Sequence, residues 1–257
     1  QSIEKNGRPV VLAGPAFTIW RAPIDNDMYK TPDWLNKYFL HKGHEASAGF
    51  SAEQHGDNWQ VLCENEFGTT NAAWGYTLKY RYTIRPTGEV EVRLTGVPVI
   101  RGTLLPAQLP RLGVVLQLSG HLDQVSWFGR GPGESYPDSC AHALLGLYEA
   151  TVRDLHTPYI KPQENGARLD TRWVGFSDGQ QTLKVQAATP LMFSAHTYST
   201  EALAKARHDH EIEQSAAIHL HLDARQLGLG SNSCGPEALP GYQLGIEPFE
   251  LAFTLVG

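Results

Sequence analysis

A strict alternation of apolar and polar residues constrains the fold of this chain more than any other feature. The apolar positions of the first run are Tyr76, Leu78, Tyr80, Tyr82 and Ile84. The turn residues Pro86 and Gly88 follow, and residues 90–94 then repeat the alternation with Val90, Val92 and Leu94. Because successive side chains of a strand point to opposite faces, each run predicts a strand with one buried face. Together they predict an antiparallel hairpin.

Strand-like runs recur along the whole chain, whereas helical signals are confined to two short stretches. The other predicted strands lie at residues 10–12, 60–63, 114–118, 125–128, 183–186, 218–222 and 249–255. The predicted helices lie at residues 31–39 and 200–206, the second with Ser199 or Thr200 as its N-cap. Strands do not alternate with long helices, which argues against a parallel α/β sheet. We therefore predict one all-β domain over residues 1–257, built from large antiparallel sheets with a few short helices.

The composition excludes several classes of protein. With 257 residues, 41% of them hydrophobic and 10% aromatic, the chain can bury a large core and does not read as disordered. A net charge of -6 argues against a nucleic-acid partner, which requires a basic surface. No segment approaches the roughly 20 apolar residues of a membrane helix. The three cysteines are odd in number and far apart in sequence, so we expect no disulfide framework and a reducing, cytoplasmic compartment. Without a Cys-x-x-Cys pair, a structural zinc site of that kind is excluded.

Four segments between predicted strands are rich in Gly, Pro, Asn, Asp and aromatic residues. They span residues 20–27, 127–138, 154–166 and 228–236. The simpler interpretation is turn chemistry, in which Gly permits positive φ and Pro fixes φ. The functional alternative is that the four segments meet at one end of a sheet and form a polar, aromatic surface. Such a surface suits a sugar, whose hydroxyls need amide and carboxylate partners and whose C–H faces stack on rings.

Taken in order, these segments resemble the C-terminal small-chain domain of the long bacterial β-galactosidases in glycoside hydrolase family two. The motifs that carry the resemblance are WRAPIDND at 20–27, WFGRGP at 127–132, YPD at 136–138, PYIKPQENG at 158–166 and GLG at 228–230. The resemblance covers nearly the whole chain. It implies a galactose-mutarotase-like fold, an antiparallel supersandwich, in agreement with the period-two pattern.

The resemblance also implies a division of labour within a larger enzyme. Retaining glycoside cleavage needs two carboxyl groups about 5–5.5 Å apart, and in the family these are glutamates of a separate (β/α)₈ barrel. Such a barrel takes about 250 residues of its own. Because the sequence begins at Gln1 rather than Met, we expect an excised domain, or a separate small subunit, that is inactive by itself. The expected partners are the barrel and other domains, further copies of the full-length enzyme, and a terminal β-D-galactoside such as lactose.

The positions that the resemblance places on the substrate side are Asp25, Asn26, Asp27, Asn232 and Cys234. In the family, a tryptophan in the loop after Gly-x-Gly forms part of the platform for the sugar beyond the scissile bond. In this sequence that position is Cys234, for which a small buried residue is the alternative interpretation. A thiol offers no flat apolar face, and losing about 50 Å² of ring contact costs roughly 1 kcal/mol. The segment after Asp27 corresponds to a mobile loop near the family's active site.

We expect no metal or cofactor in this chain. Full-length enzymes of the family resemble Mg- and Na-dependent enzymes whose ligands lie mostly in other domains. Asp25 and Asp27 are spaced as in a calcium loop, but the rest of an EF-hand is missing, so structural capping is the better interpretation. Arg21 and Arg130 are candidates for pairing with loop carboxylates.

The histidines and two further functions stay open as alternatives. A ligand cluster could form from residues 208–211 together with His219 and His221, but the apolar residues that alternate with the last two predict that both face solvent. A free-standing carbohydrate-binding module is the second candidate function. An aldose mutarotase is the third, with His156 and Glu164 as its acid–base pair.

Overall fold

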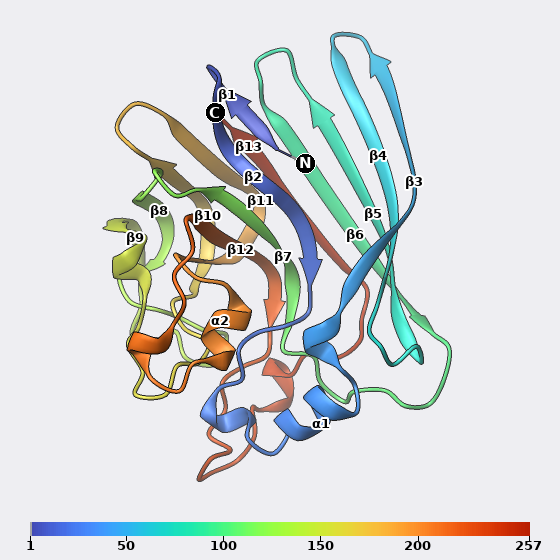
Figure 1. Cartoon of the computed structure of the whole chain (residues 1–257), viewed down its shortest axis with the longest axis vertical. Helices are drawn as coiled ribbons and strands as arrows, with labels where there is room; N and C mark the ends of the chain where they lie inside the picture. Colours follow the sequence, from blue (N-terminus) through green and yellow to red (C-terminus); the bar gives the residue numbers. More distant parts are fainter. Residues whose placement is uncertain (1) are drawn as a thin grey trace.

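β-Strands joined edge to edge make up most of the computed structural model, which describes residues 2–257 (Figure 1). The strands are β1 (Ile3–Lys5), β2 (Arg8–Thr18), β3 (His44–His55), β4 (Asn58–Gly68), β5 (Trp74–Ile84), β6 (Val90–Ile100), β7 (Arg111–Ser119), β8 (Gln124–Gly131), β9 (Leu144–Thr151), β10 (Arg168–Ser177), β11 (Thr182–His196), β12 (Ala217–Gln226) and β13 (Phe249–Val256). The helices are α1 (Thr31–Asn36) and α2 (Thr200–Lys205), with short 3-10 turns η1 (Asp25–Asp27), η2 (Leu40–Lys42), η3 (Arg153–Leu155), η4 (Asp209–Glu211) and η5 (Pro240–Tyr242). The prediction of an all-β fold with a few short helices is confirmed.

The strands pair antiparallel in one curled sheet. Ten of them follow the order β1-β2-β7-β12-β11-β13-β6-β5-β4-β3, and β10, β8 and β9 continue from the other edge of β11. The length of β11 makes this branch possible, because residues 184–187 pair with β13 while residues 192–196 pair with β12. As a result, β3–β6 and β8–β10 lie on opposite sides of the molecule (Figure 1).

The predicted hairpin is confirmed as β5 and β6, with Tyr82 opposite Val92. Gly88 closes the turn with φ +87° and donates its backbone N–H to the carbonyl of Arg85 at 2.9 Å. The apolar face of β5 is buried from residue 76 to residue 82, whereas Ile84 is 38% exposed at the rim. The alternation therefore identified the core-facing side of β5 and extended it one position too far.

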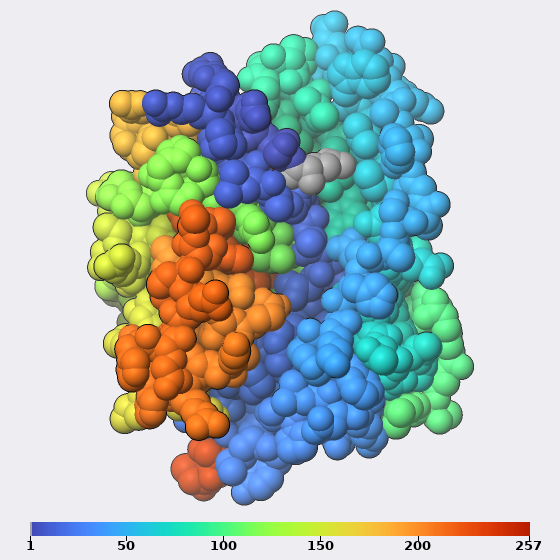
Figure 2. Space-filling model, in the orientation of Figure 1, coloured from blue at the N-terminus to red at the C-terminus, as the bar shows by residue number. Residues whose placement is uncertain are grey.

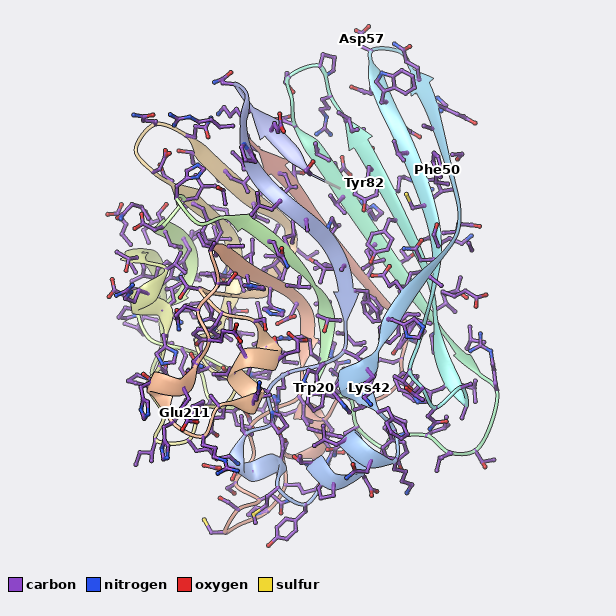
Figure 3. The ribbon with its side chains drawn as sticks, viewed as in Figure 1. Trp20, Lys42, Phe50, Asp57, Tyr82 and Glu211 are labelled. Atoms are coloured by element: carbon purple, nitrogen blue, oxygen red, sulfur yellow. The ribbon has the colours of Figure 1, made fainter. Side chains whose placement is uncertain are left out.

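The β3–β4 hairpin extends along one side of the molecule, with Asp57 at its tip (Figure 3). Sequence analysis predicted only residues 60–63 of it, because β3 carries mostly exposed side chains and shows no apolar alternation. Phe50 on β3 is 78% exposed. An edge strand of this kind depends on backbone pairing with β4 rather than on burial, so hydrophobic periodicity does not reveal it.

Strand β12 corrects the prediction that His221 faces solvent, whereas His219 is half-buried. Its other face is buried as predicted, with Ile218, Leu220 and Leu222 inaccessible to solvent. His221, however, is only 6% exposed, and its Nε2 lies 3.2 Å from the hydroxyl of Thr200 in α2. The prediction was wrong because α2 covers the face that the alternation assigned to water.

The helices and long loops gather at the lower end of the sheet as drawn in Figure 1. Figure 2 shows this end covered by the blue segment around α1, the orange segment around α2 and a projecting part of the chain near residue 235. Ser199 caps α2, accepting the backbone N–H of Ala202 at 3.1 Å, as one of the two predicted caps. None of the helices within residues 2–257 is long and apolar enough to cross a membrane.

Candidate functional site

The four loop segments meet at this end of the sheet, as the functional interpretation of their composition required. The link between residues 154–166 and residues 20–27 is a double hydrogen bond between Gln163 and Asp25, at 3.0 and 3.1 Å. The link between residues 127–138 and residues 228–236 is Asp138, whose two oxygens accept the backbone N–H groups of residues 229 and 230, both at 2.8 Å. Side chains thus replace regular backbone pairing in holding the loops together.

Asn26 fastens the first segment to the last. Its amide Nδ2 donates to the carbonyl oxygen of Gly230 at 2.8 Å, and its Oδ1 accepts the backbone N–H of Ser233 at 3.0 Å. Gly230 has φ +59°, and a Cβ there would lie 2.6 Å from the backbone nitrogen of Ala238. The loop can therefore fold back on itself and against Asn26 only because residue 230 has no side chain.

Cys234 and Asn232 lie near the tip of this last loop. The backbone N–H groups of residues 234 and 235 both donate to the carbonyl of Ser231, at 3.0 and 2.6 Å, which makes a tight turn. Cys234 is exposed and is a free thiol, whereas Asn232 is half-buried. The alternative interpretation of Cys234 as a small buried residue was wrong, because the turn directs that part of the loop away from the core.

Asp25 and Asp27 are separated by the geometry of η1. Asp25 is exposed and lies 3.9 Å from Lys161. Asp27 is 1% exposed, and its carboxylate accepts both hydrogen bonds from one nitrogen of Arg21, at 3.1 and 3.2 Å. It also accepts the backbone N–H of Ile24 at 3.1 Å. Asp27 therefore acts as the structural cap that its spacing suggested, and Asp25 faces outward.

A buried charged cluster lies beneath these loops. Arg111 of β7 binds Glu164 at 2.8 Å and Asp223 of β12 at 3.0 Å, and both partners are nearly inaccessible to solvent. Burial raises the pKa of Asp223 to about 6, against the opposing effect of Arg111. Gln226 donates to Asp223 at 2.7 Å. Sequence analysis did not identify Arg111, because a charged residue at the start of a strand carries no signal that it will be buried.

The proposed mutarotase pair does not share a site. Glu164 is committed to Arg111 inside the cluster just described. His156 instead lies between the hydroxyl of Tyr198, 2.6 Å from its Nδ1, and Asp209, 2.7 Å from its Nε2. With separate partners, the two groups are not presented together to one sugar ring as general acid and base.

The two arginines and the histidine pair that the sequence singled out make structural contacts. Arg21 pairs with Asp27 as expected, and Arg130 binds Asp170 of β10 rather than a loop carboxylate, at 2.6 Å. His208 and His210 stack on each other with ring centroids 5.7 Å apart. In the described part of the chain, no three His, Cys, Asp or Glu side chains are grouped so that they could hold a metal ion.

Comparisons with known proteins match this chain to a single family over almost its whole length. The family model described as "Beta galactosidase small chain" matches residues 1–255. The chain is 32% identical to the β-galactosidase of Actinobacillus pleuropneumoniae over 254 residues, which is 99% of this chain and 24% of that protein. It is 33% identical to the β-galactosidase of Arthrobacter sp. (strain B7) over 278 residues, covering 97% of this chain and 26% of that protein. The chain thus spans about a quarter of the length of these relatives.

Among solved structures, similarity is found to sugar epimerases at low sequence identity. A GalM/aldose epimerase homologue from C. elegans has a TM-score of 0.41 and 9% identity, covering 80% of this chain and 67% of that one. Galactose 1-epimerase from Lactobacillus acidophilus NCFM has a TM-score of 0.37 and 10% identity, covering 80% of this chain and 64% of that one.

Proposed function

Since this chain belongs to the β-galactosidase small-chain family, we propose that it is the C-terminal domain of a longer β-galactosidase. In this proposal the full-length enzyme hydrolyses terminal β-D-galactosides such as lactose. The loop cluster of this domain forms the aglycone side of the active site, and the catalytic glutamates belong to a barrel outside the chain. The barrel, the other domains and further copies of the enzyme are its partners.

One observation carries the proposed role of the loop cluster. Asn26 attaches the 228–236 loop at two points and thereby holds Cys234 exposed near the tip. The exposed carboxylate of Asp25 and the half-buried amide of Asn232 belong to the same cluster. These groups offer hydrogen-bond partners for sugar hydroxyls but no ring for stacking, which supports weak, adaptable contact with the aglycone.

The carboxylates of the chain support the proposal that catalysis needs another domain. Glu164 and Asp223 lie close to each other, but both are buried and bound to Arg111. A retaining glycosidase needs two accessible carboxyl groups flanking the scissile bond. The buried pair is closed to a saccharide, so we expect no cleavage by this chain without the barrel.

We further propose that this chain supplies no complete metal site to the enzyme and that the metal ligands of the family lie in other domains. The positions of its acidic side chains support this, since Asp27 is buried and committed to Arg21 whereas Asp25 is exposed, so the two carboxylates are not presented together to one ion. A cytoplasmic setting is also proposed, supported by the free state of Cys63, Cys140 and Cys234.

The test compares the 257-residue chain with the full-length protein on a chromogenic β-galactoside. We expect turnover by the full-length protein and none by the chain, whose folding is checked by circular dichroism. Substituting Asn26 with alanine in the full-length protein should change transfer to an added sugar acceptor more than hydrolysis of the chromogenic substrate. Cleavage by the isolated chain, or no cleavage by the full-length protein, would refute the proposal.

A further inference from the structure

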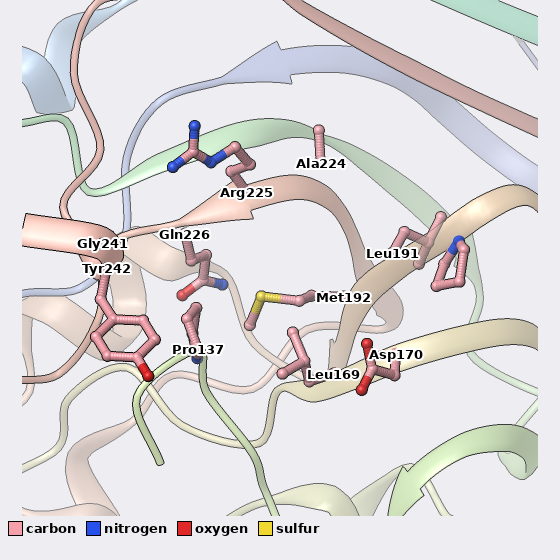
Figure 4. A pocket seen from close by; sticks show the side chains of 11 residues that line it. Pro137, Leu169, Asp170, Leu191, Met192, Ala224, Arg225, Gln226, Gly241 and Tyr242 are labelled. Carbon is pink, nitrogen blue, oxygen red and sulfur yellow. The ribbon is translucent and has the colours of Figure 1, made fainter. Parts of the chain in front are cut away.

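A cavity of about 200 Å³ lies between the start of β10, residues 190–192 within β11, the end of β12 and the short turn η5 (Figure 4). Its lining residues are Pro137, Leu169, Asp170, Pro190, Leu191, Met192, Ala224, Arg225, Gln226, Gly241 and Tyr242. None of the five substrate-side positions of the loop cluster belongs to this lining. Ligand sites for drug-sized molecules occupy roughly 300–1,000 Å³, so this cavity suits something smaller, of the size of one sugar ring.

The unpaired polar groups of the lining are acceptors. Gln226 is 3% exposed, and its amide nitrogen donates to Asp223 at 2.7 Å, while its carbonyl oxygen Oε1 has no hydrogen-bond partner. Asp170 uses Oδ2 to accept from Arg130 at 2.6 Å, which leaves Oδ1 without a partner among residues 2–257. A buried acceptor without a donor is costly, and this applies to the Gln226 oxygen, whereas the Asp170 side chain is 40% exposed. A ligand that brings hydroxyl groups complements both acceptors.

Asp170 lies in the cavity wall with an unusual backbone conformation. Asp170 has φ +56°, a left-handed conformation that few residues other than glycine adopt. It lies where the register of β10 against β11 shifts between residues 168 and 171. Bulges of this kind redirect side chains and are common beside binding sites.

Apart from Arg225, the other side chains of the wall are apolar or aromatic. The ring of Tyr242, 39% exposed, stands at the mouth with Pro137, and the thioether of Met192, 3% exposed, lies deeper in the cavity (Figure 4). Leu169 and Leu191 complete this side. A ring with C–H faces and hydroxyl edges can contact the apolar and the acceptor sides at once.

The charges of the lining disfavour an ionic ligand. Arg225 is the basic side chain of the wall, and it pairs with Glu247. Asp170 is balanced by Arg130. Within the described residues of this wall, no cation is left unpaired to attract an anion. The ligand class that fits is neutral and rich in hydroxyl groups.

We propose that this cavity binds a single neutral monosaccharide ring, stacked on Tyr242, with its hydroxyls donating to Asp170 and Gln226. The site goes beyond the proposed aglycone surface and does not depend on it, because none of the five substrate-side positions lines the cavity, and Pro137 is the one lining residue that also belongs to the four loop segments. Tyr242 also accepts the backbone N–H of Gly228 through its carbonyl at 2.8 Å. A sugar in the cavity would therefore lie against the segment that leads into the loop carrying Cys234.

The methionines allow a direct test. The chain has two, Met192 in the cavity and Met28, which is 51% exposed in the segment after Asp27. With both methyl groups labelled with ¹³C, the 257-residue protein is titrated with D-galactose and with D-glucose, and assignment uses Met28→Leu. We expect the Met192 methyl signal to shift and saturate, with a dissociation constant on the order of a millimolar. A shift of Met28 instead would place the sugar on the loop cluster.

Two variants make the test specific to the cavity wall. Tyr242→Ala removes the stacking ring and should weaken binding by at least about tenfold, whereas Asp170→Asn should weaken it less, because asparagine keeps the shape and tolerates positive φ. The matched control is Leu239→Ala, an exposed side chain of the same segment outside the lining. It should bind the sugars as the unmodified protein does.

The outcomes separate a sugar site from a cavity filled by water. A saturable Met192 shift that Tyr242→Ala and Asp170→Asn reduce, and Leu239→Ala does not, supports the proposal. A Met192 signal that does not shift, that shifts linearly with sugar, or that saturates equally in both wall variants would overturn it. If Tyr242→Ala does not fold, as its own Met192 signal would show, the comparison of Asp170→Asn with the control still decides.

Discussion

Removing the side chain of Asn26 should release the loop that carries Cys234. Two hydrogen bonds are lost in Asn26→Ala, one at 2.8 Å to Gly230 and one at 3.0 Å from Ser233. A hydrogen bond contributes about 0.5–1.5 kcal/mol net, so the pair stabilises the closed loop by about 1–3 kcal/mol. Since 1.4 kcal/mol is a tenfold change in an equilibrium constant, the opening constant of the loop should rise about 5- to 150-fold.

Hydrogen exchange of the Ser233 amide measures this opening directly, because Asn26 is the acceptor of that amide. In Asn26→Ala we expect faster exchange at Ser233 by the factor just given, at a pH where exchange is limited by the opening equilibrium. The amide of Gly235 serves as an internal reference, because its bond to Ser231 lies within the loop. Its exchange should change little if the loop moves as a unit.

Two further variants distinguish the clamp from a general loss of stability. Asn26→Asp keeps the acceptor for Ser233 and loses the donor to Gly230, so the Ser233 amide should stay protected. Asn232→Ala makes the same kind of truncation within the 228–236 loop itself, at a side chain that has no hydrogen-bond partner within residues 2–257. It should leave the exchange rate of the Ser233 amide unchanged. Exchange at Ser233 that is equally fast in Asn26→Ala and in the unmodified protein would refute the clamp.

Three other predictions concern the loop tip and the buried charges. In the full-length protein, Cys234→Trp should tighten binding of a sugar acceptor several-fold, by roughly 1 kcal/mol, while Cys234→Ala should not. An unchanged acceptor affinity in product-partition assays would contradict the interpretation that Cys234 stands in the place of a tryptophan platform. Burial lowers the pKa of His196 to about 3 and that of His221 well below its usual range, so unfolding takes up protons below pH 6.5. The free energy of unfolding should therefore fall as pH drops from about 6.5 towards 4, by up to about 2.7 kcal/mol per pH unit from this pair. In His196→Gln, urea unfolding at several pH values should show about half of that slope. An unchanged slope would indicate that the His196 ring is accessible to water. Arg111→Met strands two buried carboxylates, and we expect about 3–5 kcal/mol less unfolding free energy at pH 7, a loss that should shrink at pH 5 as Asp223, whose pKa burial raises, takes up a proton.

Much of the fold and part of the site could be predicted from local patterns. The alternation in β5 and β6, the cap of α2 at Ser199 and the turn at Gly88 are interactions between residues close in sequence, so their signals survive without the rest of the chain. The meeting of the four loop segments was an alternative that their composition left open beside simple turn chemistry. The motifs also placed Asp25, Asn26 and the Gly230 loop in one family-wide arrangement, and the structure joins them through Asn26.

What only the tertiary structure decided is burial across long sequence separations. By itself, the sequence established an antiparallel, β-rich chain and the residue types of its loops, because these depend on near neighbours. It could not show that α2 covers His221, that Arg111 binds Glu164 and Asp223, or that parts of β10, β11, β12 and η5 line a cavity. Each of these joins elements far apart in the chain. A polar residue carries the same local pattern whether it meets water or a buried partner.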